Sequence, residues 1–565
     1  MAHIYSTLSR VEDLLQKNEP LDALKLLEKS GQKHQSHAAW WAKKAEIHRV
    51  LGQINQAIQS CRQALTLNPH QISALVDMGM FLNNSSHQEL GLSLMERALT
   101  IDPSAPIPLI MSVAGRLHAC DQGDRSESIA RIEYFLKQDP ALLYLFKAAY
   151  WVPFLGIGRG LEKCIWSAIR NKISSVERWE PPPPDLIDRN HDRIRVGYIS
   201  PRFGNQSIGH VTKRLFESHN RDRFEVHVYD TRRGKDQSEY GRHIRQTCDR
   251  YVELKGVPPA QAHTILRENE VDILVDLNGY MGDTQIVETF ALRPAPVQIY
   301  WLGHGNALGL PFYDYVIGDP TVFPQEEDAH YVEAICRLPD VFAPADPHEV
   351  SETTPTRAGC GLQEGGFIFC GFNMAQKIDP SILDAWTRIL REVPDSQLWL
   401  SQSSIPLAKK NITAAVAKHG VDPERVVFAP YLADKRDHFA RIKLADLFLD
   451  TFTVNAATTA IDALWAGVPV LTRPGDHYCA RTAASLTKAV GLEEMICHDT
   501  DEYIRRAIKL ANKPAKLAAL RERLQHNISQ TTLFDPRRFS ATLEPAYISM
   551  WERAKSGQPP VSFDA

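Results

Sequence analysis

Hydrophobic and small residues follow a helical period over the first quarter of the chain and recur 34 residues further on. The matched pairs are Trp41 and Leu75, Ala45 and Gly79, Ala57 and Gly91, Ala64 and Ala98, and Pro69 and Pro103. Each unit therefore predicts two amphipathic helices that pack closely at the small residues and end at proline. We expect residues 1–140 to form an α-helical solenoid of such pairs.

This period resembles the tetratricopeptide repeat, with two well-matched copies and two degenerate ones. The degenerate copies contain Ala23 and Leu27 near the start and Asp139 and Pro140 at the end. A plain helical bundle is the alternative, and the constant spacing disfavours it. Repeat solenoids present a concave face to peptides, so we expect a protein or peptide acceptor to bind along the repeat groove.

A helical, aromatic-rich connector is expected over residues 141–190, with a stiff proline linker at 181–184. Residues 155–160 have the glycine spacing of a dinucleotide-binding loop, but no strand precedes them. We therefore interpret that segment as a turn between helices.

After the prolines, short apolar runs alternate with helical stretches. Strands are expected at 194–200, 224–229, 271–277, 297–302 and 313–317, and then at 367–372, 397–400, 426–429, 447–450 and 468–472. This alternation predicts parallel sheets covered by helices. Two sets of strands predict two Rossmann-like domains, residues 191–350 on the acceptor side and residues 351–565 with closing helices. Their ligand should lie in the cleft beyond the carboxyl ends of the strands.

Composition narrows the class of protein. The 565 residues are 44% hydrophobic and 23% charged, with a formal charge of -4, so nucleic-acid binding is not expected. No run of about 18 apolar residues and no signal-peptide pattern is present, so we expect no membrane association. The 9 cysteines include no C-x-x-C pair, which disfavours a disulfide scaffold or zinc site. We expect a cytoplasmic protein without a cofactor.

Two segments that follow expected strands carry candidate chemistry. Lys377 can place a positive charge on a phosphate, although a solvated surface lysine is the alternative. The segment 431–438 can hold a nucleobase through backbone groups and a ring, whereas His438 alone could be an ordinary helix-surface histidine.

The third and strongest segment follows the strand at 447–450. Thr458 and Thr459 open a helix whose N–H groups suit a pyrophosphate. Asp462 lies one turn further on and can accept hydrogen bonds from ribose hydroxyls. Simple N-capping by threonine is the alternative.

Three motifs, at 290–298, 372–380 and 455–467, together resemble the protein O-GlcNAc transferase family. In that family tetratricopeptide repeats are joined to a GT-B glycosyltransferase region, and the resemblance runs from about Ile194 to Trp551. SPINDLY-type O-fucosyltransferases and bacterial N-glucosyltransferases are its relatives. The resemblance implies an inverting transferase that moves GlcNAc from UDP-GlcNAc to Ser or Thr hydroxyls of proteins, without a metal.

By position, the resemblance implies that Lys377 neutralises the leaving diphosphate, that Thr458 and Thr459 bind it, and that Asp462 binds the ribose. The other residues it implies for the nucleotide-sugar site are Leu432, Ala433, Lys435 and His438 around the uracil, and Asn455.

The base position departs from the family pattern. Gln206 stands where the family's O-GlcNAc transferases carry a histidine often assigned as the base, and glutamine cannot take a proton. His210, Asp276 and His304 are the candidate replacements. We favour His210, which follows the same strand-loop turn, so the expected catalytic set is Lys377, His210 and Gln206.

Two further departures are Ala457 in place of a histidine and Met374 in place of a glutamine. Another donor, with O-fucosyl or N-glucosyl transfer, therefore stays open, although Asp462 and Trp465 favour UDP over the nucleotide of the fucosyl relatives. A repeat scaffold with weakened catalysis, suggested by Gln206, is the alternative from a different class.

Overall fold

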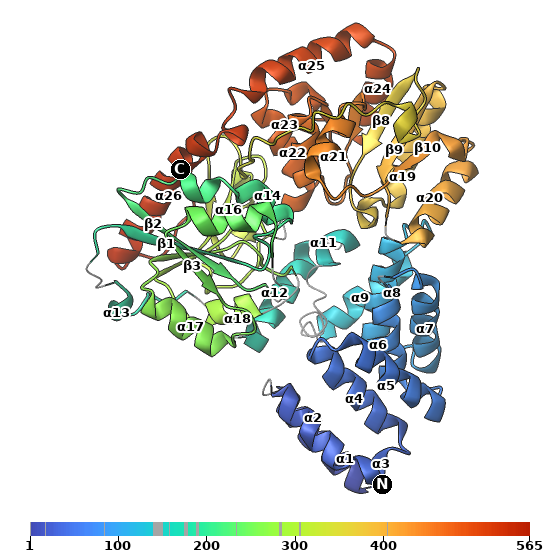
Figure 1. Ribbon diagram of the computed structural model, residues 1–565, viewed down its shortest axis with the longest axis vertical. Coiled ribbons are helices and arrows are strands. Elements are labelled where there is room, and N and C mark those ends of the chain that lie inside the picture. Colours follow the sequence, from blue (N-terminus) through green and yellow to red (C-terminus); the bar gives the residue numbers. More distant parts are fainter. Residues whose placement is uncertain are drawn as a thin grey trace. The chain divides into compact units, whose positions relative to one another are not determined.

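The computed structural model describes residues 2–16, 19–83, 85–138, 151–156, 159–173, 179–187, 191–232, 234, 236–281, 285–303, 307–403 and 405–565. It forms two compact units, residues 1–135 with 403–414, and residues 136–402 with 415–565. The first unit is a helical array and the second is an α/β body with two parallel sheets (Figure 1). No helix within the described ranges is long and apolar enough to cross a membrane.

The expected helix pairs of the repeat region are confirmed. The elements are α1 (Ala2–Gln16), α2 (Pro20–Lys29), α3 (Gly31–His34), α4 (Ala38–Val50), α5 (Ile54–Leu67), α6 (Ile72–Asn83), α7 (Gln88–Ile101), α8 (Pro106–His118) and α9 (Ser126–Gln138). Helices α6 and α7 begin 34 residues after α4 and α5, as the sequence period predicts. The expected repeat end at Asp139 and Pro140 lies outside the described residues.

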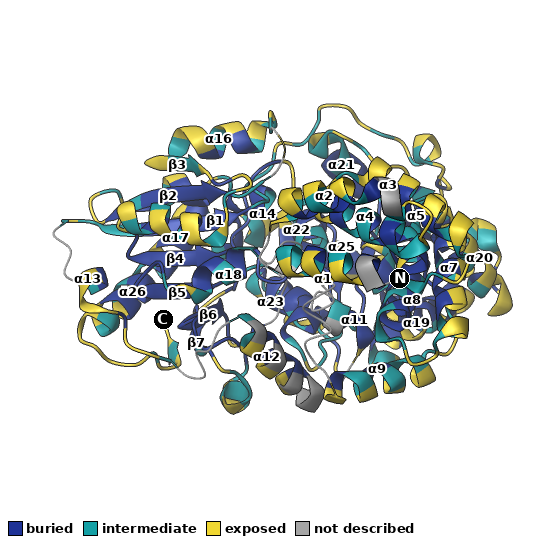
Figure 2. Ribbon diagram, turned by 90° about the horizontal axis from the view of Figure 1, so that it is seen from below, coloured by how far each residue is buried: buried dark blue, intermediate teal, exposed yellow. Residues whose placement is uncertain are grey.

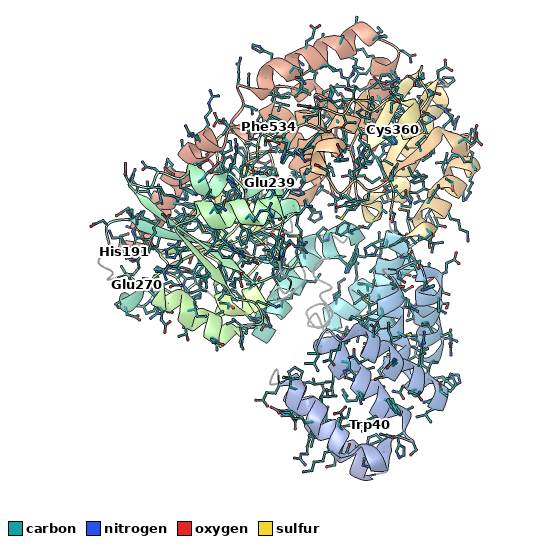
Figure 3. All side chains as sticks on the ribbon, in the orientation of Figure 1. Trp40, His191, Glu239, Glu270, Cys360 and Phe534 are labelled. Atoms are coloured by element: carbon teal, nitrogen blue, oxygen red, sulfur yellow. The ribbon has the colours of Figure 1, made fainter. Side chains whose placement is uncertain are left out.

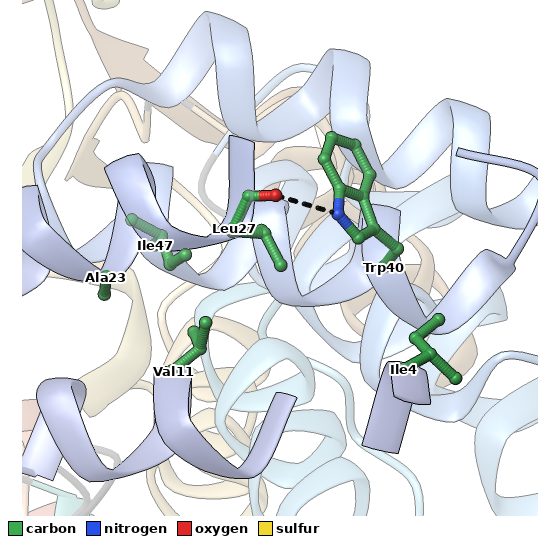
Figure 4. Packing of buried hydrophobic residues seen from close by; sticks show 6 residues of the cluster. All are labelled: Ile4, Val11, Ala23, Leu27, Trp40 and Ile47. Carbon is green, nitrogen blue, oxygen red and sulfur yellow. Dashed lines mark hydrogen bonds between the residues drawn. The ribbon is translucent and has the colours of Figure 1, made fainter. Parts of the chain in front are cut away.

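Small residues allow these helices to approach closely, and large residues fill the space between them. A Cβ at Gly91 would lie 2.6 Å from Asn83 Oδ1 and 3.0 Å from the Gly79 carbonyl oxygen, so α6 and α7 approach closely there. Trp40 of α4 is buried against the first pair, and its Nε1 donates to the Leu27 carbonyl of α2 at 3.2 Å (Figure 4). The apolar residues around it are Ile4, Val11, Ala23, Leu27 and Ile47.

The first sheet of the α/β body contains β1 (Ile194–Ser200), β2 (Phe224–Asp230), β3 (Arg250–Glu253), β4 (Ile273–Asp276), β5 (Val297–Tyr300), β6 (Tyr315–Gly318), β7 (Ala334–Arg337) and β13 (Phe563–Asp564). The order is β13-β7-β6-β5-β4-β1-β2-β3 and every pairing is parallel. Its central strands are buried, and the covering helices expose their outer faces (Figure 2). This is the doubly wound arrangement expected from strand–helix alternation.

The second sheet contains β8 (Phe367–Gly371), β9 (Ser396–Ser401), β10 (Val426–Ala429), β11 (Leu447–Leu449) and β12 (Val470–Leu471), in the order β10-β9-β8-β11-β12. It is also parallel throughout. We call the body around the first sheet the first lobe and the body around the second sheet the second lobe.

The remaining helices cover these sheets or join them, except that most of α20 belongs to the repeat unit. They are α11 (Val152–Leu155), α12 (Arg159–Ile173), α13 (Pro184–Ile187), α14 (Ser207–Thr212), α15 (Leu215–Ser218), α16 (Glu239–Thr247), α17 (Pro259–Glu268), α18 (Gln285–Ala291), α19 (Pro380–Glu392), α20 (Pro406–Lys418), α21 (Lys435–Ile442), α22 (Thr458–Trp465), α23 (Thr482–Ala489), α24 (Thr500–Ala511), α25 (Pro514–Ile528) and α26 (Pro536–Lys555).

The end of the chain returns to the first lobe. The ring of Phe539 in α26 stacks on Trp301 with centroids 5.7 Å apart, and the hydroxyls of Tyr547 and Tyr198 lie 3.1 Å apart. The expected range 351–565 therefore gives its last helix and β13 to the first lobe. The sequence expectation omitted β3, β7 and β13, because β3 is a half-exposed edge strand and β13 has only 2 residues.

Candidate active site

Loops from both lobes line one cavity of about 580 Å³. In each sheet the strand order reverses beside its first strand, β1 in the first lobe and β8 in the second. The loops that follow β1 and β4 supply Arg202 and Met281, and the loops that follow β8 and β11 supply Lys377 and Asn455. The cavity therefore lies at the two switch points, where doubly wound sheets bind ligands.

Lys377 is held in this cavity by the second lobe. Its Nζ donates to the Asn455 carbonyl at 2.7 Å. Burial lowers the pKa of Lys377, and the nearby Asp450 carboxylate opposes that effect. Within the described ranges no carboxylate forms an ion pair with Lys377, so its charge is available to an anion.

The start of α22 adds a second attraction for an anion. Ala457 occupies the N-cap and provides no side-chain cap, so the threonines are not capping residues. Thr458 and Thr459 line the cavity, and Thr459 Oγ1 donates to Asn373 Oδ1 at 2.8 Å. Uncapped N–H groups and the positive end of the helix dipole favour a phosphate at this position.

The expected ribose ligand, Asp462, already has a partner. Lys435 Nζ lies 3.0 Å from Asp462 Oδ1. Burial raises the pKa of Asp462, and Lys435 opposes that rise. A ribose hydroxyl would therefore join or replace an existing ion pair.

The expected uracil-binding segment, residues 431–438, leads into α21 and includes its first turn. His438 Nδ1 accepts a hydrogen bond from Arg441 Nε at 3.1 Å, and its ring meets Phe372 edge-on at 5.4 Å. Burial, with Arg441 and Lys435 nearby, lowers the pKa of His438 to about 3, so this ring is neutral at neutral pH. Leu432 and Ala433 lie in the loop before α21, next to Tyr431, which is 81% exposed.

Residues predicted to bind the donor line two separate cavities of the α/β body. Lys377, Asn455, Thr458 and Thr459 line the larger cavity. Ala433 and Lys435 line a second cavity of about 440 Å³ between the lobes. Glu239 of α16, labelled in Figure 3, also lines it and pairs with Lys213. A further cavity, of about 710 Å³, lies between α24 and α25 and contains none of the predicted residues.

A sequence profile of the family described as Glycosyl transferase family 41 matches residues 170–353 and 347–543. The chain belongs to this family.

Relatives of this family 41 chain include the Arabidopsis thaliana protein named Probable UDP-N-acetylglucosamine--peptide N-acetylglucosaminyltransferase SEC, 32% identical over 79% of this chain and 47% of its own length. A Solanum lycopersicum protein with the same enzyme name and the suffix SPINDLY is 31% identical over 65% of this chain and 39% of its own. The chain thus spans about half the length of these curated relatives or less. A solved structure of a mutant Thermobaculum terrenum O-GlcNAc transferase has a TM-score of 0.68 and 25% identity, covering 98% of both chains.

His210, the favoured base, is engaged at both ring nitrogens. Its Nε2 lies 2.7 Å from Asn205 Oδ1, and its Nδ1 lies 3.0 Å from Lys435 Nζ. Lysine can only donate, so Nδ1 accepts and Nε2 carries the proton. Burial, with Lys435 and His348 nearby, lowers the pKa of His210 to about 2. In this structure His210 connects the two lobes. Its Nδ1 could accept a proton from a substrate only after Lys435 had moved away.

The other base candidates have different surroundings. Asp276 is fully buried and accepts hydrogen bonds from the Asn278 and Gly279 N–H groups and the Tyr313 hydroxyl, so it holds the turn after β4. Gln206 is exposed, and its Oε1 accepts from Arg202 Nη1 at 3.2 Å. His304 lies outside the described residues.

Sequence reasoning missed several residues that line the cavity. They are Trp151, Pro153 and Phe154 of the connector, Arg202 and Ser207 after β1, and Tyr478, Cys479 and Thr482 of the second lobe. Arg202 could have been found, because it follows the expected strand at 194–200. The described lining contains Arg202 and Lys377 as its charged side chains and no Asp, Glu or His. In the described part of the chain, no group of three or more His, Cys, Asp or Glu is arranged to hold a metal ion.

Proposed function

We propose that the chain is an inverting glycosyltransferase that moves a sugar, GlcNAc in the first instance, from UDP-sugar to Ser or Thr hydroxyls of a protein. The observation that carries this proposal is the pairing of Lys377 with the uncapped start of α22 in one cavity at both switch points. Two positive features beside each other suit a diphosphate better than any other part of a sugar nucleotide.

In the proposed reaction, the acceptor hydroxyl oxygen bonds to the anomeric carbon as the bond from that carbon to the diphosphate oxygen breaks. Lys377 and the α22 N–H groups stabilise the charge that develops on the leaving diphosphate. The described lining offers no carboxylate as a nucleophile, which favours one displacement with inversion over a two-step route. The hydroxyl proton passes to water or to the departing phosphate, unless His304 receives it.

The donor assignment rests on the second lobe. Trp465 Nε1 donates to the His348 carbonyl at 3.0 Å, which fixes the end of α22 that carries Asp462. The resemblance associates Asp462 and Trp465 with UDP, and the names of the relatives specify N-acetylglucosamine. The acceptor is a protein or peptide along the repeat groove, in the cytoplasm, without a metal, nucleic acid or membrane in the reaction.

Thermal shifts with UDP, GDP and their sugars test the donor class, because a ligand that binds only the folded state raises the melting temperature. We expect stabilisation by UDP and UDP-GlcNAc and none by GDP or GDP-fucose at the same concentration. Transfer of radiolabelled GlcNAc to a protein acceptor, with product anomeric configuration determined by NMR, then tests the reaction. Stabilisation by GDP-fucose alone would favour fucosyl transfer, and UDP binding without transfer from any donor would favour a scaffold.

A further inference from the structure

Arg202 is fixed at the cavity wall of the first lobe. It follows the central strand β1, and its N–H donates to Ser200 Oγ at 3.1 Å. Its carbonyl accepts from the Gly209 N–H at 3.0 Å, inside α14. A Cβ at Gly209 would lie 2.1 Å from the Gly204 carbonyl oxygen, so the loop and α14 are packed tightly. The backbone that carries the guanidinium is therefore held at both ends.

The guanidinium of Arg202 lacks an anionic partner within the described ranges. Nη1 donates to the neutral amide of Gln206, and Nε is buried without a hydrogen-bond partner. Arg232 in the same lobe also has a buried Nε without a hydrogen-bond partner, but its guanidinium forms ion pairs with Asp230 and Asp236. A buried donor atom without an acceptor is costly, and the charge of this half-exposed guanidinium has no countercharge in the described structure, so the cavity wall at Arg202 suits an anion.

The diphosphate of the proposed donor already has two features that suit it, and neither belongs to the lobe of Arg202. Lys377 and the start of α22, which suit the diphosphate, both belong to the second lobe, whereas Arg202 belongs to the first. The wall near Arg202 also includes Ser207, and Trp151 and Phe154 of the connector line the same cavity. The planar fork of arginine matches a carboxylate through two parallel hydrogen bonds.

We propose that Arg202 forms a subsite for a carboxylate of the acceptor, an Asp or Glu side chain close to the residue that receives the sugar. This subsite rests on the proposed function, because it presumes that the first lobe faces the acceptor. It makes the enzyme selective for acidic stretches of a polypeptide.

Peptide binding to the full chain in the presence of UDP tests the subsite directly. The peptides carry one central Ser and differ only by Glu, Gln or Lys at one of the four nearest positions, and affinity is measured by fluorescence anisotropy. At one position or more, wild-type protein should bind the Glu peptide at least about tenfold more tightly, as a charge-assisted hydrogen bond allows. Arg202→Gln should abolish that ratio, and Arg202→Glu should make a Lys peptide the preferred one.

Arg242→Gln is the matched control, since Arg242 is exposed on α16 and does not line the cavity. It should keep the wild-type ratio. Melting temperatures of all variants, with Arg202→Lys as a charge-conserving variant, show whether the fold is intact. An equal affinity for Glu and Gln peptides in the wild type, no binding of any peptide, or an unchanged ratio in Arg202→Gln would overturn the subsite.

Two further arms identify other sources of the anion. A loss of UDP affinity in Arg202→Gln, alike for all peptides, would make Arg202 a diphosphate ligand. If Arg202→Gln loses affinity for UDP-glucuronic acid but keeps its affinity for UDP-glucose, the carboxylate belongs to the donor sugar. Either result overturns the acceptor subsite, while UDP stabilisation of the wild type reports on the proposed function separately.

Discussion

At the scale of single residues, the cavity contains two cations without a matching countercharge in the described structure. Lys377 and Arg202 face it from opposite lobes without an ion pair in the described structure, whereas Lys435 is tied to Asp462 at 3.0 Å. Part of the cavity wall is therefore available to an anion, whereas Asp462, the expected ribose ligand, would first have to exchange its partner.

Lys377→Ala should lower kcat/KM for sugar transfer by on the order of a hundredfold or more, because the leaving diphosphate loses its nearest cation. Removing a desolvated charge should leave the melting temperature unchanged or slightly higher. Initial rates with radiolabelled donor measure the first effect, and Lys443→Ala, an exposed lysine just after α21, is the control. Full activity in Lys377→Ala would exclude the assigned role.

His348 provides a test of pH dependence. Its ring stacks on Phe439 at 4.6 Å, and burial, with Lys435 and Lys213 nearby, lowers its pKa to about 3. Between pH 3 and 6.5 the unfolded chain binds one more proton at this residue than the folded chain does. The free energy of unfolding therefore falls as the pH falls, by up to about 1.4 kcal/mol per pH unit.

Urea unfolding of wild type and His348→Gln at pH 7.5, 6.0 and 5.0 isolates that contribution. The wild-type advantage over the variant should shrink at each step towards pH 5.0. The same comparison with His498→Gln, an exposed histidine before α24, should show no such trend. A constant difference across the three pH values for His348→Gln would contradict the assignment.

At the scale of elements, the match between sequence and structure follows from what each element needs. The buried strands β1 and β8 were expected at their observed positions, because continuous apolar runs mark strands covered on both faces. The position of the candidate binding residues in loops after the strands of the second lobe was also predicted, because doubly wound sheets bind ligands beyond the carboxyl ends of their strands. The edge strand β3 was missed, since its half-exposed pattern carries little apolar signal.

Contacts between segments far apart in the chain could not be predicted from the sequence. His210 was expected as a base because of its place after β1, but its contact with Lys435 joins residues 225 apart. That contact depends on how the lobes pack, which no local pattern encodes. Trp151 and Phe154 belong to a connector for which the sequence predicts only helices rich in aromatic residues, and only the fold brings them to the cavity wall.

Gly91→Ala tests the helix packing of the repeats. The added methyl group would meet the Gly79 carbonyl at 3.0 Å and the Asn83 backbone nitrogen at 2.9 Å, and neither backbone can yield easily. We expect a loss of about 1–3 kcal/mol in the stability of the repeat unit, as for other overpacked sites. Hydrogen exchange of α6 and α7 measures it.

Leu90→Ala is the control for that change, because Leu90 neighbours Gly91 on α7 and is 52% exposed. Its exchange rates should stay close to those of the wild type. Equal protection in Gly91→Ala and Leu90→Ala would contradict the close approach of α6 and α7.

At the scale of the whole molecule, the repeats and the α/β body have different proposed tasks. Residues 403–414, between β9 and β10, belong to the repeat unit, and Asn411 Nδ2 donates to the Ala119 carbonyl at 2.9 Å. A truncation that tests the repeats should therefore leave α8 and this segment intact.

Deleting residues 1–101 should reduce transfer to protein acceptors much more than hydrolysis of the donor, because solenoids bind peptides but hold no catalytic group. Parallel assays of protein labelling and UDP release measure the two rates. The surface pair of Lys410 and Glu89 would be lost, at a cost below about 1 kcal/mol. An equal fall of both rates would mean that the repeats support the catalytic fold.

The return of α26 and β13 to the first lobe also sets an order of events during synthesis. A ribosome delivers β1 to β7 early, but the tyrosine that meets Tyr198 and the strand that pairs with β7 emerge only after the whole second lobe has been made. Until then, the β7 edge of the first sheet lacks its pairing strand β13, and the part of the first lobe that α26 covers stays exposed while the second lobe folds. A nascent chain stalled before residue 536 should therefore hold a finished second lobe beside an unfinished first one.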